Sequence, residues 1–252
     1  MRILVTNDDG IDAPGLAILT EAARALSDEV FVVAPATEQS GQSHAVTLVD
    51  PLRCARIDDR RWAVEGTPAD CVAMAFSAIL DEAPDLVVSG VNQGFNVADD
   101  MLYSGTVGAA MQGAAMGARS IAFSQAYRRL GQEREADIWG PARAHCAATL
   151  KALAGLEGAP SILNVNFPAC GADQVAGMEA VRQGTRESHE VYTERRVDGR
   201  GQPYHWLRFR RDAGAPAPGT DLSALAANRI AVTPLAPDLT DHSALDALEG
   251  AL

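Results

Sequence analysis

The feature that most constrains the fold is a repeated alternation of short apolar runs with longer stretches of helical periodicity. Apolar runs with the length of β-strands occupy residues 3–6, 30–34, 85–89, 120–123 and 161–165. Helical patterns separate them, after Pro14 and over residues 69–80, 106–117 and 136–153. The runs are apolar throughout rather than at alternate positions, which is typical of parallel strands buried on both faces. The sequence therefore predicts an α/β fold with a doubly wound, mostly parallel, Rossmann-like sheet in three layers.

The composition changes after about residue 181. Residues 184–216 are rich in Arg, Glu and Gly, and they contain two strand-like runs, at 190–193 and 204–209. Turn-forming residues at 198–201 lie between these runs. This order predicts a β-hairpin that protrudes from the α/β body.

After the hairpin, the chain is expected to form one more strand of the α/β body and then a C-terminal tail. Residues 229–233 have the composition of a strand, and the tail from residue 242 to 252 has that of a short helix. We therefore expect an α/β core at residues 1–182. Residues 183–252 would supply the hairpin arm, the returning strand and the C-terminal tail, with a role in oligomerisation.

The charge balance excludes one large class of partner. The chain has 252 residues and a formal net charge of −12. A protein that binds duplex nucleic acid normally presents a basic surface, so a nucleic-acid polymer is not expected, whereas a mononucleotide is not excluded. No segment approaches the roughly 20 apolar residues of a membrane span, and the first residues do not have the pattern of a signal peptide. We therefore expect a cytoplasmic protein without a membrane partner.

Two adjacent carboxylates, Asp8 and Asp9, directly follow the first predicted strand. Ligands of open α/β sheets bind at the carboxyl ends of the strands. Neighbouring carboxylates repel one another unless a cation neutralises them, and oxygen ligands suit Mg²⁺, Mn²⁺ or Ca²⁺. An acidic turn, with Gly10 allowing the chain to reverse, accounts for the same residues, so both interpretations stay open here.

Polar loops follow two further strands at the same predicted edge. Ser40 lies in the loop after residues 30–34, and its hydroxyl could bind a metal or donate to a phosphate, or the residue could simply form a turn. Asn92 and Asn96 lie after residues 85–89, among glycines that would let backbone N–H groups approach an anion. An ordinary Gly/Asn turn is the alternative for this loop.

A helix of small residues begins at Ser104, Gly105 and Thr106. Hydroxyl donors and free N–H groups at a helix N-terminus form an anion site, which a phosphate could occupy. A plain N-cap by Ser104 or Thr106 is the alternative. The start of another helix, Thr67 and Pro68 with Asp70, is expected to be a capping motif, with substrate contact as the secondary interpretation.

Taken together, these motifs resemble the SurE family, the stationary-phase survival proteins that are metal-dependent 5′-nucleotidases. The resemblance covers nearly the whole chain, and its strongest part runs from Pro84 to Asn92 and on to Thr106. Further matching motifs occur at residues 7–15, 34–35, 40–41, 66–71, 219–221, 233–235 and 238–240. The sequence departs from the family pattern at Ala36, where an Asp is common, and at the bulky Gln93 and Phe95. These departures bear on substrate preference and remove none of the expected ligands.

The resemblance implies the roles of the site residues. Asp8, Asp9, Ser40 and Asn92 would bind one divalent metal ion per subunit, Mg²⁺ or Mn²⁺. The phosphate of a nucleoside monophosphate would contact four other residues: Asn96, Ser104, Gly105 and Thr106. The family also implies a homodimer or homotetramer that exchanges the arm and the tail between subunits.

The expected chemistry is hydrolysis of the phosphate monoester of nucleoside 5′-monophosphates. Asp8 or Asp9 would help to deprotonate a water that attacks phosphorus in line, while the metal acts as a Lewis acid. A covalent aspartyl intermediate stays open. The alternatives for function are 3′-nucleotidase or short-chain exopolyphosphatase activity on the side, or a nucleotide sensor without catalysis.

Overall fold

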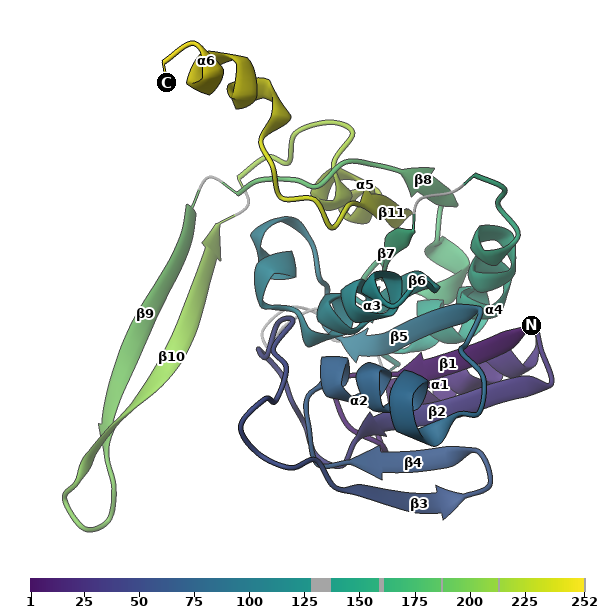
Figure 1. Cartoon of the computed structure of the whole chain (residues 1–252). Coiled ribbons are helices and arrows are strands. Elements are labelled where there is room, and N and C mark those ends of the chain that lie inside the picture. Colours follow the sequence, from purple (N-terminus) through teal and green to yellow (C-terminus); the bar gives the residue numbers. More distant parts are fainter. Residues whose placement is uncertain (128–136, 159–160, 187, 213, 252) are drawn as a thin grey trace.

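A computed structural model describes residues 1–127, 137–158, 161–186, 188–212 and 214–251 of the chain (Figure 1). The strands of the main sheet are β1 (Arg2–Thr6), β2 (Glu29–Pro35), β3 (Cys54–Asp58), β4 (Arg61–Val64), β5 (Leu86–Gln93), β6 (Arg119–Gln125), β7 (Ile162–Phe167), β8 (Met178–Ala180) and β11 (Ile230–Leu235). They are arranged in the order β3-β4-β2-β1-β5-β6-β7-β11-β8. All neighbours are parallel except the β3/β4 and β7/β11 pairs. The predicted doubly wound, mostly parallel α/β fold is confirmed.

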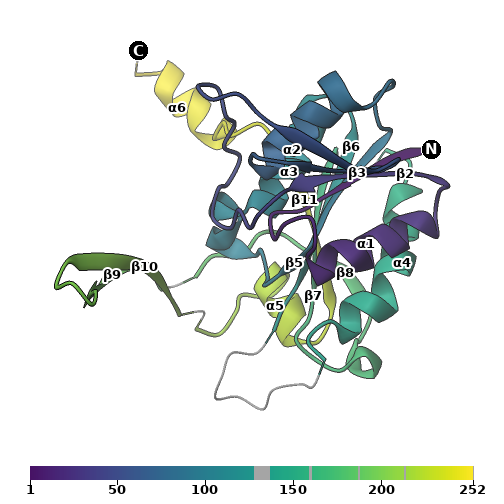
Figure 2. The same ribbon diagram turned by 90° about the horizontal axis from the view of Figure 1, so that it is seen from below.

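Helices cover both faces of this sheet. Helices α1 (Pro14–Arg24) and α4 (Gly140–Ala154) lie on one face, and α2 (Pro68–Met74) and α3 (Gly105–Ala115) lie on the other (Figure 2). Val88 of β5 packs in the core beneath α1 and α4, while its neighbour Val87 packs in the core beneath α2 and α3. Because both faces are covered, successive strand residues are all buried, which explains the continuous apolar runs.

Several local boundaries differ from those expected. The helix predicted over 69–80 is α-helical only to Met74 and continues as a π-helical segment, Ala75–Ile79. Its predicted start is confirmed, since Thr67 and Asp70 form a capping box. The first residue of the helix expected over 136–153, Ala136, lies outside the described residues. Strand β3 was not predicted, because all of its residues are exposed and it lacks an apolar pattern.

The C-terminal part contributes both to the sheet and to a projecting arm. Strands β9 (Ser188–Val197) and β10 (Pro203–Asp212) pair only with each other in an antiparallel hairpin, which extends away from the body (Figure 1). The predicted hairpin is therefore confirmed. Helix α5 (Asp221–Ala226) precedes β11, which inserts between β7 and β8. The tail ends in α6 (Leu245–Glu249).

No helix among the described residues has the length and apolar character needed to cross a bilayer.

Candidate active site

Asp8 and Asp9 lie immediately beyond the carboxyl end of β1, in a loop held by backbone and side-chain hydrogen bonds. The side-chain amide of Asn7 donates to the Gly10 carbonyl at 2.9 Å, and Gly10 has a φ of 104°. The backbone N–H of Gln39 donates to the Asp8 carbonyl at 2.7 Å. These bonds fix the acidic loop beside the loop that follows β2.

The Asp8 carboxylate is buried, with 4% of the residue exposed. Its Oδ1 accepts a 2.7 Å hydrogen bond from the Thr106 hydroxyl. Burial raises the pKa of Asp8 to about 6; the hydrogen bonds from Thr106 oppose this rise and the charge of Asp9 adds to it. None of the ion pairs found among the described residues involves Asp8 or Asp9. Asp8 is therefore a buried carboxylate for which the described part of the chain supplies no ion-pair partner.

The Asp9 carboxylate is bound to the extension of β5. Its Oδ2 accepts a 3.1 Å bond from the backbone N–H of Gln93. Burial raises the pKa of Asp9, the bond from Gln93 lowers it, and the nearby charge of Glu38 raises it further. The pKa values of both adjacent carboxyl groups are thus raised, and a bound cation would lower them again.

Ser40 and Asn92 come to the same edge from β2 and β5. Ser40 is exposed, and its hydroxyl donates to Glu38 Oε1 at 2.9 Å. Asn92 was expected in a loop, but it lies in β5 itself, after a register shift that places it opposite Ser124 of β6. Its amide donates to the Gly94 carbonyl at 3.0 Å. That bond uses the side-chain nitrogen of Asn92 and leaves its oxygen as a possible ligand.

The N-terminus of α3 faces Asp8. Ser104 is the N-cap, since its Oγ accepts from the backbone N–H of Val107 at 3.1 Å, so the capping interpretation is confirmed for this residue. A Cβ on Gly105 would lie 2.9 Å from the Asp8 Cβ, and so only glycine permits this close approach. The Asn96 amide donates to Ser124 Oγ at 2.8 Å and, less closely, to Thr106 Oγ1 at 3.4 Å.

These loops border one cavity of about 990 Å³. The predicted residues that line it are Asp8, Ser40, Asn92, Asn96 and Ser104. The other three, Asp9, Gly105 and Thr106, do not line it but directly contact residues that do. All eight predicted site residues, which are scattered from position 8 to position 106, are therefore neighbours in the structure.

Of the apolar wall of this cavity, the sequence pointed only to Phe95, through its expected effect on substrate preference. The wall contains Phe95, Tyr103 and Tyr127 from the body, together with Val191, Leu207 and Phe209 from the arm. The rings of Tyr103 and Phe209 meet edge to face, with centroids 5.3 Å apart. Tyr103 directly precedes the Ser104 motif and could have been noticed there, but the arm residues carry no local signal of their role.

The donor set suits a hard divalent cation. It offers only oxygen ligands: two carboxylates, a hydroxyl and a side-chain carbonyl. Within the described part of the chain, no group of three or more His, Cys, Asp or Glu residues could hold a metal. A metal at this edge would therefore depend on the neutral oxygens of Ser40 and Asn92 to complete a set begun by Asp8 and Asp9.

Comparison with known proteins agrees with this geometry. The family model described as "Survival protein SurE" matches residues 3–190. The 5′-nucleotidase SurE of Methylocella silvestris is 53% identical over 247 residues, covering 97% of each chain, and that of Methylobacterium nodulans is 55% identical over 250 residues with the same coverage. The crystal structure of the SurE protein from Aquifex aeolicus superimposes with a TM-score of 0.82 at 35% identity, covering 100% of this chain and 99% of that one. The chain therefore belongs to the SurE family.

Proposed function

We propose that this protein is a divalent-metal-dependent 5′-nucleotidase that hydrolyses the phosphate monoester of nucleoside 5′-monophosphates. The relatives that match it over nearly their full length are named 5′-nucleotidase SurE. The observation that carries the proposal is the adjacent pair of a buried Asp8 and a half-buried Asp9 beside one cavity, where Asp8 faces the N-terminus of α3. A bound metal would neutralise this pair of carboxylates, for which the described residues supply no cation, and a helix N-terminus favours an anion such as phosphate.

In this proposal the metal ligands are Asp8, Asp9, Ser40 and Asn92, with one Mg²⁺ or Mn²⁺ per subunit. The bound cation supplies a Lewis acid that polarises the phosphoryl group. Thr106 and Gln93 each donate a hydrogen bond to one of the carboxylates, at 2.7 and 3.1 Å. Those bonds hold the carboxylates in place and leave an oxygen of each available.

The chain's own groups would bind the phosphate and move the proton. The Asn96 amide and the N-terminal turn of α3 donate hydrogen bonds to the phosphate oxygens, and they stabilise the charge that develops there. Asp8 or Asp9 accepts the proton of the attacking water. In the metal-free protein burial raises the pKa of Asp8 to about 6, and a bound cation would lower this pKa and keep the carboxylate ionised at neutral pH.

The apolar wall would receive the nucleoside. A cavity of about 990 Å³ is large enough for a nucleotide, for which typical ligand sites span roughly 300–1,000 Å³. Tyr103, Tyr127 and Phe95 offer ring faces on which a base can stack. Because Phe95 is bulkier than is usual in the family, we expect it to influence base preference.

We also propose that residues 1–182 form the catalytic core and that residues 183–252 mediate oligomerisation. The arm exposes Trp206 and Leu207, at 52% and 67%, and the tail exposes Leu239 at 90%. Exposed apolar side chains on projecting segments favour burial against a second copy, so the arm and tail would exchange between subunits of a homodimer or homotetramer. Light scattering of the purified protein tests this, and a monomer at micromolar concentration would contradict it. A cytoplasmic location stays a prediction, which cell fractionation checks.

A panel of substrates and metals tests the activity. The purified protein should release phosphate from 5′-AMP or 5′-GMP with Mn²⁺ or Mg²⁺, and it should lose this activity in EDTA. The same panel, extended to 3′-AMP and short polyphosphate, ranks the side activities. Tight nucleotide binding without any turnover would overturn the proposal in favour of a sensor.

A further inference from the structure

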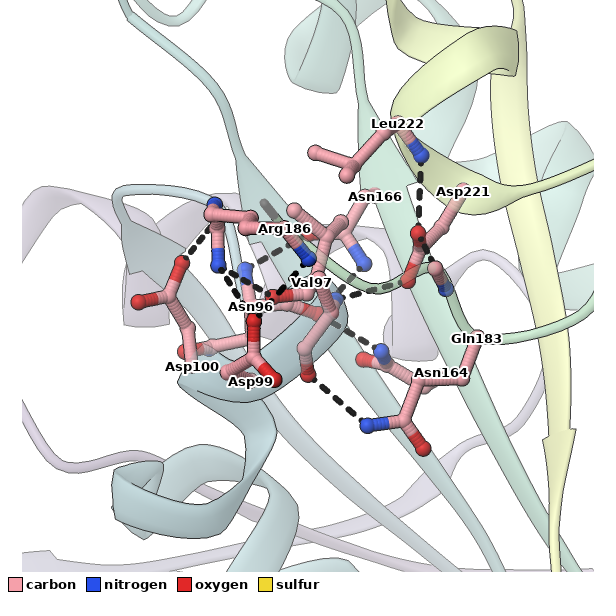
Figure 3. A network of polar contacts seen from close by, with 12 residues as sticks. Asn96, Val97, Asp99, Asp100, Asn164, Asn166, Gln183, Arg186, Asp221 and Leu222 are labelled. Atoms are coloured by element: carbon pink, nitrogen blue, oxygen red, sulfur yellow. Dashed lines mark hydrogen bonds and ion pairs between the residues drawn. The ribbon is translucent and has the colours of Figure 1, made fainter. Parts of the chain in front are cut away.

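Asn96 is held from the opposite side of the site by two buried asparagines of β7. Its backbone N–H donates to Asn166 Oδ1 at 2.8 Å, and its carbonyl accepts from Asn164 Nδ2 at 2.7 Å and from Asn166 Nδ2 at 3.1 Å (Figure 3). Both asparagines are completely buried. The backbone of Asn96 is thereby fixed, and its side-chain amide is directed toward Ser124 and Thr106.

The turn that follows Asn96 is anchored by a carboxylate from a distant part of the chain. Asp221, at the start of α5, is completely buried. Its Oδ2 accepts from the backbone N–H of Ala98 at 2.9 Å, and its Oδ1 accepts from those of Gly184 and Leu222 at 2.9 and 2.7 Å (Figure 3). Ala98 has a φ of 50°, an unfavourable conformation for alanine that these contacts hold in place.

Arg186 anchors the same turn from the base of the arm. Its side chain is only 2% exposed and pairs with the buried Asp100 at 2.6 Å. It also donates to the Val97 carbonyl at 3.4 Å, and its guanidinium carbon lies 5.8 Å from the centre of the Phe95 ring. Arg186 lies two residues before β9, so the arm and the loop of the site share one buried ion pair.

We infer that Asp221 and Arg186 are positioning residues for the phosphate site: they hold residues 96–100, and with them Asn96, in the geometry that binds phosphate. This inference rests on the proposed function, in which Asn96 contacts the phosphate. Neither residue needs to touch the substrate. Asp221 acts through the backbone of Ala98, and Arg186 acts through Asp100 and Val97. The segment that carries the arm thus sets the shape of the loop from which Asn96 contacts the phosphate.

The test combines kinetics with amide exchange in Asp221→Asn, a substitution that keeps the size of the side chain but turns an acceptor into a donor opposite the Ala98 N–H. We expect kcat/KM for 5′-AMP to fall about ten-fold, and the inhibition constant of inorganic phosphate to rise in parallel, because small displacements of a site are costly. The amides of residues 96–100 should exchange faster. In an Asn96→Ala background, the same substitution should change kcat/KM by less than about two-fold, because the two residues act through one contact.

Asp70→Asn is the matched control. Asp70 is also buried in the first turn of a helix and accepts from the backbone N–H groups of Thr67 and Thr47, so its hydrogen bonds among the described residues go to residues 47 and 67 rather than to residues 96–100. It should leave kcat/KM and the exchange of residues 96–100 unchanged. If Asp221→Asn does not fold, Arg186→Lys carries the same test, since it keeps the charge and loses the planar group that reaches both Asp100 and Val97.

Three results would overturn the inference: unchanged exchange of residues 96–100 in Asp221→Asn, effects of Asp221→Asn and Asn96→Ala that multiply independently, or equal effects of Asp70→Asn and Asp221→Asn. A wild-type protein without turnover would contradict the proposed function alone, because the exchange measurement still decides whether Asp221 holds the loop.

Discussion

Asp8 and Asp100 are buried to the same degree, at 4% and 5% exposed, and both line the cavity, Asp8 from a loop and Asp100 from the short 3-10 helix Ala98–Tyr103, yet they are neutralised differently. Asp100 pairs with the guanidinium of Arg186 at 2.6 Å. Asp8 has a hydroxyl donor, Thr106, and another carboxylate, Asp9, as its neighbours, and burial raises its pKa to about 6. A buried charge that the protein compensates holds the structure together. One that the protein leaves uncompensated makes the metal-free fold less stable, and it supports a role in binding a cation.

The largest effect, a loss of activity, should come from removing a carboxylate charge from the pair Asp8 and Asp9. Asp9→Asn should lower kcat/KM for 5′-AMP by about a thousand-fold, because a metal supplies several kcal/mol of transition-state stabilisation. Circular dichroism should show an intact fold. Steady-state phosphate release in Mn²⁺ measures the loss, and full activity in the variant would remove Asp9 from the proposed ligand set.

Breaking the buried ion pair between Asp100 and Arg186 should mainly lower the stability of the fold. Arg186→Met should lower the free energy of unfolding by about 3–5 kcal/mol, since it removes the buried guanidinium that pairs with the buried carboxylate of Asp100 at 2.6 Å. Urea denaturation measures the difference. Arg143→Met, which breaks an exposed ion pair with Asp137, is the control and should unfold like the wild type. Equal stability of both variants would show that Asp100 does not depend on Arg186.

In the absence of metal, Asp8→Asn should raise the free energy of unfolding, whereas Arg186→Met should lower it. The pKa of Asp8 is raised from 3.8 to about 6, so the folded state binds the proton more tightly than the unfolded state does. The stability linked to this group is present below about pH 4 and is lost as the pH rises through 6, a loss of about 3 kcal/mol by pH 7.

Thermal unfolding in EDTA between pH 4.5 and 7.5 measures this dependence. The advantage of Asp8→Asn over the wild type should grow across that range, and the wild type should recover when Mn²⁺ or Mg²⁺ is added. A variant less stable than the wild type at pH 7 in EDTA would mean that Asp8 is compensated after all.

The smallest effect should come from a carboxylate that is paired but exposed. Glu194 in the arm forms ion pairs with Arg196 and Arg208, at 2.5 and 3.1 Å, and these pairs are exposed to solvent. Solvent and salt screen such pairs, so Glu194→Gln should leave Tm unchanged within error. A clear loss of Tm would instead indicate that the arm is buried against a second copy in solution.

Patterns of neighbouring residues were enough to predict much of the fold. The apolar run before Ser89, the capping box of Thr67 and Asp70, and the hairpin around residues 198–201 were all confirmed. Each is encoded within a few positions of the chain. Strand β3 was missed, because a strand whose side chains are all exposed has no periodicity to detect.

The site was predictable only in part. Parallel strands place their carboxyl ends at one edge, so the positions of Asp8, Ser40 and Asn92 after three predicted strands were enough to expect them together. The buried Asn164 and Asn166 of β7 were visible as polar residues at alternate positions of an apolar strand, but their partner, Asn96, was not. Contacts from the arm, such as Phe209 with Tyr103, join segments that no local pattern relates.

The sequence by itself determined the order of helices and strands and the presence of polar loops after β1, β2 and β5, because periodicity and turn residues act over short distances along the chain. It also assigned the chain to its family. Only the tertiary structure decided which of these two buried carboxylates has a cationic partner among the described residues. Asp8 and Asp100 are the same residue type at the same cavity, and their difference depends on Arg186, which lies 86 positions from Asp100 and reaches it only when the chain folds back upon the sheet.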